Sequence, residues 1–372
     1  MGACLAHLLH DGYTDALYAL LPVWQAQFGL SYAGVAMVRA LYYGTMGGLQ
    51  VPFDRFAGRL TPRVVLALST LIAAAGFLVM AVPAGFAGLC VGLVLAGTGS
   101  SVQHSRASHL VSMSYGEASR GPLGIYNFAG DLGKAALPAI VALLLPILAW
   151  RSVVGLTGLF GVAVAFGLLV LLPRRFSEAP VAEATSRRDS GRSGFGILLA
   201  IGVLDSATRM GYLLFLPFLI HARGGASATV GLGLALVFAG GAFGKASCGW
   251  LGQRVGVVGS VMVTETATAA LIVVSLFAPL ALMLAVLPLL GAVLNGTSSV
   301  LYGTVPEIAP KGDVGRAFAV FYTGVISSGG IAPIVYGAIA DHSSQAVGIL
   351  AAACTALLIV PLALKLPASL SK

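Results

Sequence analysis

Several ionisable side chains interrupt stretches of sequence that are otherwise apolar. His7, Asp11 and Asp15 follow one another at intervals of four residues near the start of the chain. In a helix, this spacing places all three on one face. Ionisable groups are costly to bury in an apolar environment, so they are usually retained for proton relays, ion paths or ligand contacts. Asp11 is therefore our first candidate for a proton carrier, with His7 as its neighbouring relay.

Other charges recur within later apolar stretches. Asp131 and Lys134 are three residues apart. Asp205 and Arg209 are four apart, so in each pair the acid can meet the base along one helix face. Asp15, Asp131 and Asp205 complete the set of candidate proton carriers. The same spacing also fits purely structural ion pairs, and both interpretations stay open.

Basic and polar residues in these stretches are candidates for substrate contacts. Arg39 can pair with Asp15 or contact an anionic group, and charge-assisted hydrogen bonds make such contacts strong. If all charges pair internally, a neutral or zwitterionic solute fits better. Lys245 and Glu265 are interpreted as a structural pair. The candidate substrate-binding residues are Arg39, Tyr42, His104, Asn127, Lys134, Arg209, Asn295 and Tyr322.

The composition indicates whether this chain folds in water or in a lipid bilayer. Hydrophobic residues make up 58% of the sequence and charged residues only 9%, against roughly 25% charged residues in soluble domains. The net charge is +8. Most Lys and Arg lie in short gaps between apolar stretches, a bias that orients membrane helices. The expected partner is therefore the lipid bilayer and not nucleic acid.

The apolar stretches have the length of membrane spans, because a helix needs about 20 residues to cross a hydrocarbon core of ~30 Å. The sequence predicts an all-α membrane protein with twelve transmembrane helices in two parallel six-helix repeats, over residues 1–172 and 195–372. A basic cytoplasmic linker is expected at 173–194. The predicted spans are 3–23, 31–53, 63–82, 86–108, 120–147, 151–172, 195–220, 227–250, 257–278, 280–303, 314–340 and 344–366.

The basic gaps fall on one side of the predicted membrane when the spans are counted in order. This asymmetry predicts a multi-pass protein with both termini in the cytoplasm. We expect it in a plasma membrane, most simply a bacterial inner membrane. We also expect the protein to be a monomer.

The two halves of the chain match each other at a constant offset of 195 residues. An even number of spans per half gives both repeats the same orientation, as in secondary transporters with a site near the membrane midplane. The matching landmarks are Leu21-Pro22 with Leu216-Pro217, Arg59 with Arg254, and Pro138 with Pro333.

The loop after the eighth predicted span, Gly249 to Gly256, reads GWLGQRVG. It resembles the G-x-L-x-D-R-x-G loop of the major facilitator superfamily, with Gln253 in place of the acid. The matching loop after the second span also lacks the acid, because Gly58 occupies its position. The resemblance covers the whole chain and implies halves that rock about a central cavity. It implies a gating role for Asp54, Arg55, Arg59, Gly249, Arg254 and Gly256.

Shorter motifs resemble one branch of that superfamily. The segment from His7 to Tyr13, HLLHDGY, is similar to the H-x-x-N-D-x-Y opening of the fosmidomycin-resistance-like branch. Gly97 to Ser101 with His104 resembles its fourth span, and Asn127 with Gly130 and Gly133 resembles its fifth. That branch contains proton-driven exporters of drugs and small organic compounds, so the resemblance implies an antiporter that works by alternating access.

The sequence thus predicts a secondary active transporter that exports a small organic compound in exchange for protons. Uptake or exchange of a small organic anion, read by the basic side chains, is one alternative. Export of a metal ion or metal chelate is another, because His7, Asp11 and His104 offer suitable ligand atoms. A receptor or assembly factor on the same scaffold would gain little from the buried charges. No catalytic motif stands out, so we expect neither an enzyme nor a resident cofactor.

Overall fold

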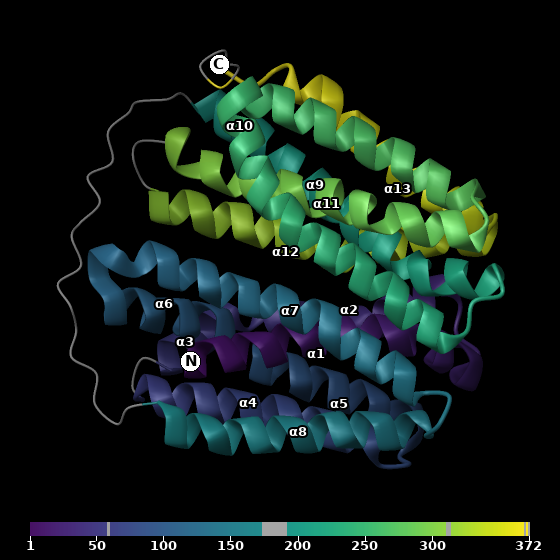
Figure 1. Ribbon diagram of the computed structural model, residues 1–372. Helices are drawn as coiled ribbons and strands as arrows, with labels where there is room; N and C mark the ends of the chain where they lie inside the picture. The colour runs from purple at the N-terminus through teal and green to yellow at the C-terminus, as the bar shows by residue number, and fades with distance from the viewer. Residues whose placement is uncertain (58–59, 173–191, 310–313, 368–369, 371–372) are drawn as a thin grey trace. The chain divides into compact units, whose positions relative to one another are not determined.

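The computed structural model describes residues 1–57, 60–172, 192–309, 314–367 and 370 (Figure 1). Within these ranges every regular element is a helix. The predicted all-α fold is therefore confirmed. The part of the predicted linker at 173–191 lies outside the described residues, and α9 begins at Arg192, just inside the predicted linker range.

The first half of the chain forms six spans. Two of them are interrupted: α2 passes into α3 at Leu49, and α5 passes into α6 after Ser100. A short 3-10 helix, Gly116–Ser119, precedes α7. The helices are α1 (Gly2–Phe28), α2 (Tyr32–Gly48), α3 (Gln50–Ala57), α4 (Pro62–Ala81), α5 (Gly85–Ser100), α6 (Gln103–Tyr115), α7 (Arg120–Leu144) and α8 (Trp150–Leu171).

The second half repeats this pattern. A short 3-10 helix, Val305–Glu307, follows α11, and α10 contains two of the predicted spans. The helices are α9 (Arg192–Ala222), α10 (Ser227–Phe277), α11 (Leu280–Thr304), α12 (Val314–His342) and α13 (Gln345–Ala363).

Ten helical segments in the described residues are long and apolar enough to cross a membrane. The other two spans of the predicted twelve are α1 and the broken α2–α3 segment. α1 has 27 residues, but His7, His10, Asp11 and Asp15 make it unusually polar for a spanning helix. All four side chains are buried within the protein, as expected for ionisable groups that cannot face lipid.

The contacts divide the molecule into two compact units. The first contains Met1–Gly29, the helices from Met37 through α8, and Ser227–Ala235. The second contains Leu30–Ala36, α9, and the helices from Leu236 onward. In the first unit α1 packs along α7, and α4 packs between α5 and α8; in the second, α9 packs against α12 and α13.

Glycines allow α1 and α7 to approach closely. A Cβ atom added to Gly133 would lie 1.9 Å from the carbonyl oxygen of Leu8, and one added to Gly12 would lie 2.9 Å from the Cβ of Leu137. Small residues at such positions let membrane helices pack backbone to backbone. This contact fixes the helix face that carries His7 and Asp11 against α7.

The residues that guided the repeat prediction lie at equivalent places. Pro22 and Pro217 lie inside α1 and α9, and Pro138 and Pro333 lie inside α7 and α12. Gly256 has φ 71° and ψ 174° and separates the two spans within α10. A residue with a side chain is strained at such a positive φ, so glycine suits this turn.

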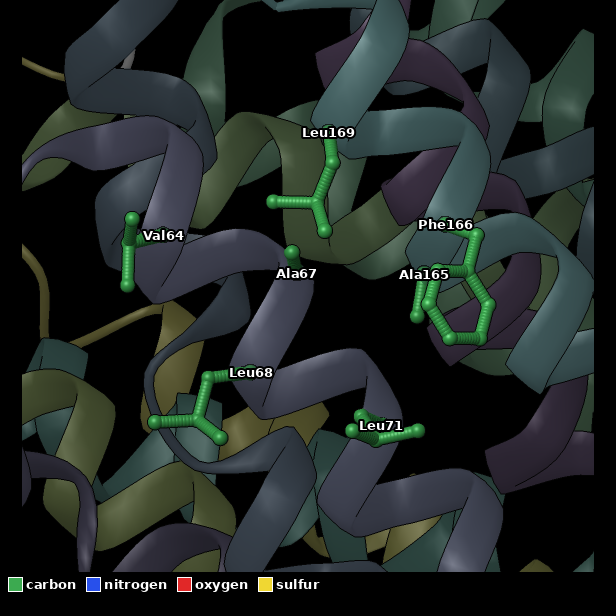
Figure 2. Close-up of a pocket in the computed structure, with 7 residues that line it drawn as sticks. All are labelled: Val64, Ala67, Leu68, Leu71, Ala165, Phe166 and Leu169. Atoms are coloured by element: carbon green, nitrogen blue, oxygen red, sulfur yellow. The ribbon is translucent and has the colours of Figure 1, made fainter.

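An apolar groove lies between α4 and α8 (Figure 2). Only apolar side chains line it, and Phe166 and Leu68 are partly exposed there. Such a surface suits contact with lipid tails and offers no polar group that could orient a solute. The lining residues are Val64, Ala67, Leu68, Leu71, Ala165, Phe166 and Leu169.

Candidate functional site

Helices α1, α6 and α7 bring four ionisable residues together in the first unit. We call His7, Asp11, His104 and Lys134 the Asp11 cluster. One carboxylate oxygen of Asp11, Oδ2, lies 3.2 Å from His7 Nε2 and 3.3 Å from Lys134 Nζ. The other oxygen, Oδ1, lies 3.3 Å from His104 Nε2. His7 and Asp11 are buried, whereas the side chains of His104 and Lys134 are 40% and 30% exposed. The cluster is therefore buried on one side and accessible on the other.

The protonation of His7 follows from its hydrogen bonds. Its Nδ1 atom lies 2.9 Å from the carbonyl oxygen of Tyr126. A carbonyl can only accept, so Nδ1 carries a hydrogen. In a neutral imidazole, Nε2 would then present a lone pair to Asp11 Oδ2 at 3.2 Å, and two acceptors would face each other. A proton on either His7 Nε2 or the Asp11 carboxyl removes this conflict.

His10 lies one turn away, and its hydrogen bonds require no additional proton. Its Nε2 is 3.0 Å from Thr70 Oγ1, and its Nδ1 is 2.9 Å from Ser100 Oγ. The Thr70 hydroxyl donates to the Leu66 carbonyl, so its oxygen accepts from His10 Nε2. Ser100 then donates to Nδ1 and accepts from Tyr42, 2.8 Å away. A neutral His10 satisfies every member of this chain.

The walls of the Asp11 cluster are close-fitting. The His7 ring stacks on Tyr126 with ring centroids 4.0 Å apart and meets His104 edge-on at 5.1 Å. A Cβ atom added to Gly130 would lie 2.6 Å from Asp11 Oδ2 and 2.7 Å from His7 Nε2. Gly130 on α7 therefore leaves the space that the His7–Asp11 pair occupies.

The second unit holds a different polar cluster. Asp205 on α9 and Glu265 on α10 are buried and hydrogen-bond to each other. Arg209 exerts an electrostatic effect on both acids, and its Nη1 atom lies 3.4 Å from Ser298 Oγ. The sequence pattern predicted a functional role for Asp205 and Arg209 and a structural role for Glu265. The pairing of Glu265 with Lys245 stays a prediction.

The other predicted charges, Arg39, Asp15 and Asp131, lie in the first unit. Arg39 is 2% exposed, and its guanidinium carbon lies 4.4 Å from the centre of the Tyr18 ring and 4.8 Å from that of Tyr43. These are cation–π distances. Asp15 and Asp131 are buried. The proposed pairings of Asp15 with Arg39 and of Asp131 with Lys134 stay predictions.

The predicted polar contacts fall into two groups. Tyr42 and Asn295 are buried and have hydrogen bonds within the protein, Tyr42 to Ser100 and Asn295 to the Gly291 carbonyl. Asn127 and Tyr322 are exposed, and the Tyr322 ring packs on Tyr302 with centroids 4.8 Å apart. The roles of all four residues in substrate binding stay predictions.

The predicted gating residues are only partly described. Asp54 and Arg55 belong to α3, and Arg59 lies outside the described residues. Gly249 and Arg254 belong to α10, Arg254 being exposed, and Gly256 forms the turn at its kink. The final glycine of the loop motif thus sits where the chain reverses between two spans. Its gating role stays a prediction.

The chain belongs to the Major Facilitator Superfamily, whose family model matches residues 3–204 and again residues 198–372. It is therefore a multi-pass membrane transporter and not an enzyme, as the sequence predicted. The fosmidomycin resistance protein of Escherichia coli (strain K12) is 23% identical to this chain over 141 residues. That match spans 38% of this chain and 35% of the relative.

Solved transporter structures share the fold. A bacterial homologue of the human lysosomal transporter Spinster, in an inward-facing and occupied conformation, matches with a TM-score of 0.78 at 15% identity. A POT family transporter in complex with 5-aminolevulinic acid matches with a TM-score of 0.80 at 12% identity. The matches cover 100% of this chain and 97% and 96% of those chains. Identities this low establish the fold and leave the substrate open.

Proposed function

We propose that this protein is a proton-coupled antiporter that exports a small organic compound, with the coupling proton carried by His7 and Asp11. The observation that carries the proposal is the contact between His7 Nε2 and Asp11 Oδ2 at 3.2 Å. Because His7 Nδ1 is committed to the Tyr126 carbonyl, this contact is favourable only when a proton lies between the two side chains.

The proton and the cargo compete for Asp11. With the proton present, His7, Asp11 and Lys134 together carry a net charge of +1, and loss of the proton leaves Asp11 and Lys134 as a neutral pair. A cargo that donates hydrogen bonds to the free carboxylate cannot bind while the proton occupies it. Binding of one therefore expels the other, which is the requirement for antiport. The accessible His104 and Lys134 side chains lie where the cargo would enter.

The nature of the cargo rests on the relative and on the sequence. The name of the similar Escherichia coli protein, a fosmidomycin resistance protein, supports export of a small organic compound and supplies fosmidomycin as the first probe. The distribution of basic residues supports cytoplasmic termini. We place the protein in a bacterial inner membrane as a monomer.

Transport by purified protein in liposomes tests this proposal. A thermal-shift screen of drugs, phosphonates and organic anions, beginning with fosmidomycin, selects the radiolabelled probe. An acidic lumen should drive accumulation of the probe through the wild-type protein. Asp11→Asn should abolish the gradient-driven part and retain exchange of the probe across the membrane, because the amide holds the geometry without carrying a proton.

The matched control is Asp189→Asn, the same substitution in the predicted linker, which should leave accumulation unchanged. Undiminished gradient-driven accumulation by Asp11→Asn would show that the proton travels elsewhere. Asp131→Asn and Asp15→Asn in the same assay would then locate it.

A metal ion is the second candidate for the Asp11 cluster. One ligand atom each from His7, Asp11 and His104 lie within 4.8 Å of one another, and a histidine whose other nitrogen binds a carbonyl is a common metal ligand. The Lys134 ammonium, 3.3 Å from Asp11, opposes a divalent cation at the same place. Stabilisation of the wild-type protein by Zn²⁺ or Mn²⁺, lost in His7→Ala and in His104→Ala, would favour the metal over the proton.

A further inference from the structure

The acids of the second unit form a pair that is more deeply buried than the Asp11 cluster. Asp205 is 3% exposed and Glu265 is 1% exposed, and their side chains hydrogen-bond to each other. The charged groups that act on the pair, among the residues that the structure describes, are the two acids themselves and Arg209. Thr297 is also hydrogen-bonded to Glu265.

A hydrogen bond between two carboxyl groups requires a proton on one of them, because ionised carboxylates only accept. Two ionised carboxylates in contact also repel each other, which is why close acid pairs share a proton. Counting charge gives the same answer. With one shared proton the pair carries −1, and the guanidinium of Arg209 balances it.

The hydroxyl groups next to Glu265 hydrogen-bond to one another and to the backbone. The Thr264 hydroxyl donates to the Ser260 carbonyl, and the Thr297 hydroxyl donates to Thr264 over 2.8 Å. These hydroxyls are therefore part of a hydrogen-bonded polar region next to Glu265, between α10 and α11.

Three further buried polar atoms indicate that the region is more than a packed core. Glu265 Oε1 has no hydrogen-bond partner within the described structure, and neither do the hydroxyls of Thr208 and Thr268. Both threonines are 1% exposed. Each lies three residues after one of the acids and thus on the same helix face. Unsatisfied polar groups at this depth are expensive, so their grouping beside the two acids is unusual for a core that serves packing alone.

The repeat relation gives independent support for the contact. Subtracting the 195-residue offset from Asp205 and Glu265 gives His10 and Thr70. In the first unit these two residues are also hydrogen-bonded, with His10 Nε2 3.0 Å from Thr70 Oγ1. The same two positions therefore meet in both repeats. The first repeat fills them with a neutral pair, whereas the second fills them with two acids.

We propose that Asp205 and Glu265 share one proton and form a second proton-binding site of this transporter, with Arg209 as the counterion. Gain of another proton neutralises the pair. Loss of the shared proton leaves a net charge of −1. The site does not depend on Asp11, so this proposal can stand or fall without the coupling proposed above.

Infrared difference spectroscopy tests the site without a known substrate. Protein purified in a detergent without carbonyl groups is compared in H₂O and D₂O at neutral pH, where a protonated carboxyl gives a C=O band that shifts on deuteration. We expect this band in the wild-type protein and in Asp11→Asn. We expect its loss in Glu265→Gln and in Asp205→Asn.

Glu265→Gln should keep the fold, because its amide can donate to Asp205 as the protonated acid does. Its thermal midpoint should lie close to that of the wild type. Thr268→Val, a change of similar size in the same region, should keep the band. Absence of a deuterium-sensitive carboxyl band from Asp11→Asn, or its persistence in both acid variants, would overturn the proposal. The Asp11→Asn spectrum decides the matter even if an acid variant fails to fold.

Discussion

Adding one methyl group at Gly130 should disturb the proton site without changing any polar residue. The new Cβ would lie 2.6 Å from Asp11 Oδ2 and 2.7 Å from His7 Nε2. Both atoms are the ends of side chains, so they can retreat while the helices stay in place. Gly130→Ala should therefore act on the His7–Asp11 pair more than on the packing of α1 against α7.

The size of the effect follows from ordinary contact distances. A Cβ atom needs about 3.4 Å from its neighbours, so the carboxylate must move by about 0.8 Å. Moved away from His7, it would stretch the 3.2 Å contact to about 4 Å, beyond hydrogen-bonding range. The loss of a hydrogen bond to a charged group costs about 1.5–3 kcal/mol. We expect Gly130→Ala to lower stability by that amount and to impair gradient-driven accumulation.

Thermal unfolding in detergent and proton-driven accumulation in liposomes measure the two consequences. Gly124→Ala on the same helix is the matched control, because a Cβ atom there meets nothing within 4 Å. Replacing this flexible glycine with alanine should stabilise the helix by about 0.5–1 kcal/mol. Gly133→Ala should be worse for folding, because its Cβ would meet the Leu8 backbone at 1.9 Å. Wild-type stability and accumulation in Gly130→Ala would refute the reasoning.

Three other substitutions test separate parts of the account. Lys134→Met should destabilise the protein by about 1–3 kcal/mol, because the buried Asp11 carboxylate loses one of its hydrogen-bonding partners, and adding Asp11→Asn should restore most of the loss in a double-mutant cycle. Gly256→Ala should destabilise the fold by about 1–3 kcal/mol and lower the unfolding midpoint, because φ 71° with ψ 174° is a backbone conformation essentially reserved for glycine, whereas Gly252→Ala should have little effect. Arg209→Gln should reduce transport of an anionic probe more than that of a neutral one, and equal reduction would exclude charge recognition by this residue.

The sequence predicts the architecture well because membrane spans and repeats leave strong patterns. Apolar length gave the twelve spans, and the 195-residue offset placed Pro138 and Pro333 at matching positions in α7 and α12. The four-residue spacing of His7 and Asp11 predicted their shared face, and the metal hypothesis already grouped His104 with them. The structure brings these three together and adds Lys134. Periodicity along one helix does not reveal which residues of other helices will meet that face.

The details that decide protonation were less predictable. The hydrogen bond from His7 to the Tyr126 carbonyl involves a backbone atom, and a pattern of residue types does not predict such a contact. Glu265 was different, because the offset already maps it onto Thr70 and Asp205 onto His10. Comparing polar residues between the repeats would have singled it out. The cluster around Asp11 has no charged counterpart at the equivalent positions of the second half, where Gly202 replaces His7 and Ser206 replaces Asp11.

Proton flux coupled to transport is the most direct measure of the central claim. Liposomes loaded with a pH-sensitive dye report protons that leave the lumen when the transported probe is added outside in the absence of a gradient. The wild-type protein should release protons as the probe enters, and Asp11→Asn should move the probe with no proton release. Proton release by Asp11→Asn equal to that of the wild type would contradict the assignment of the coupling proton to His7 and Asp11.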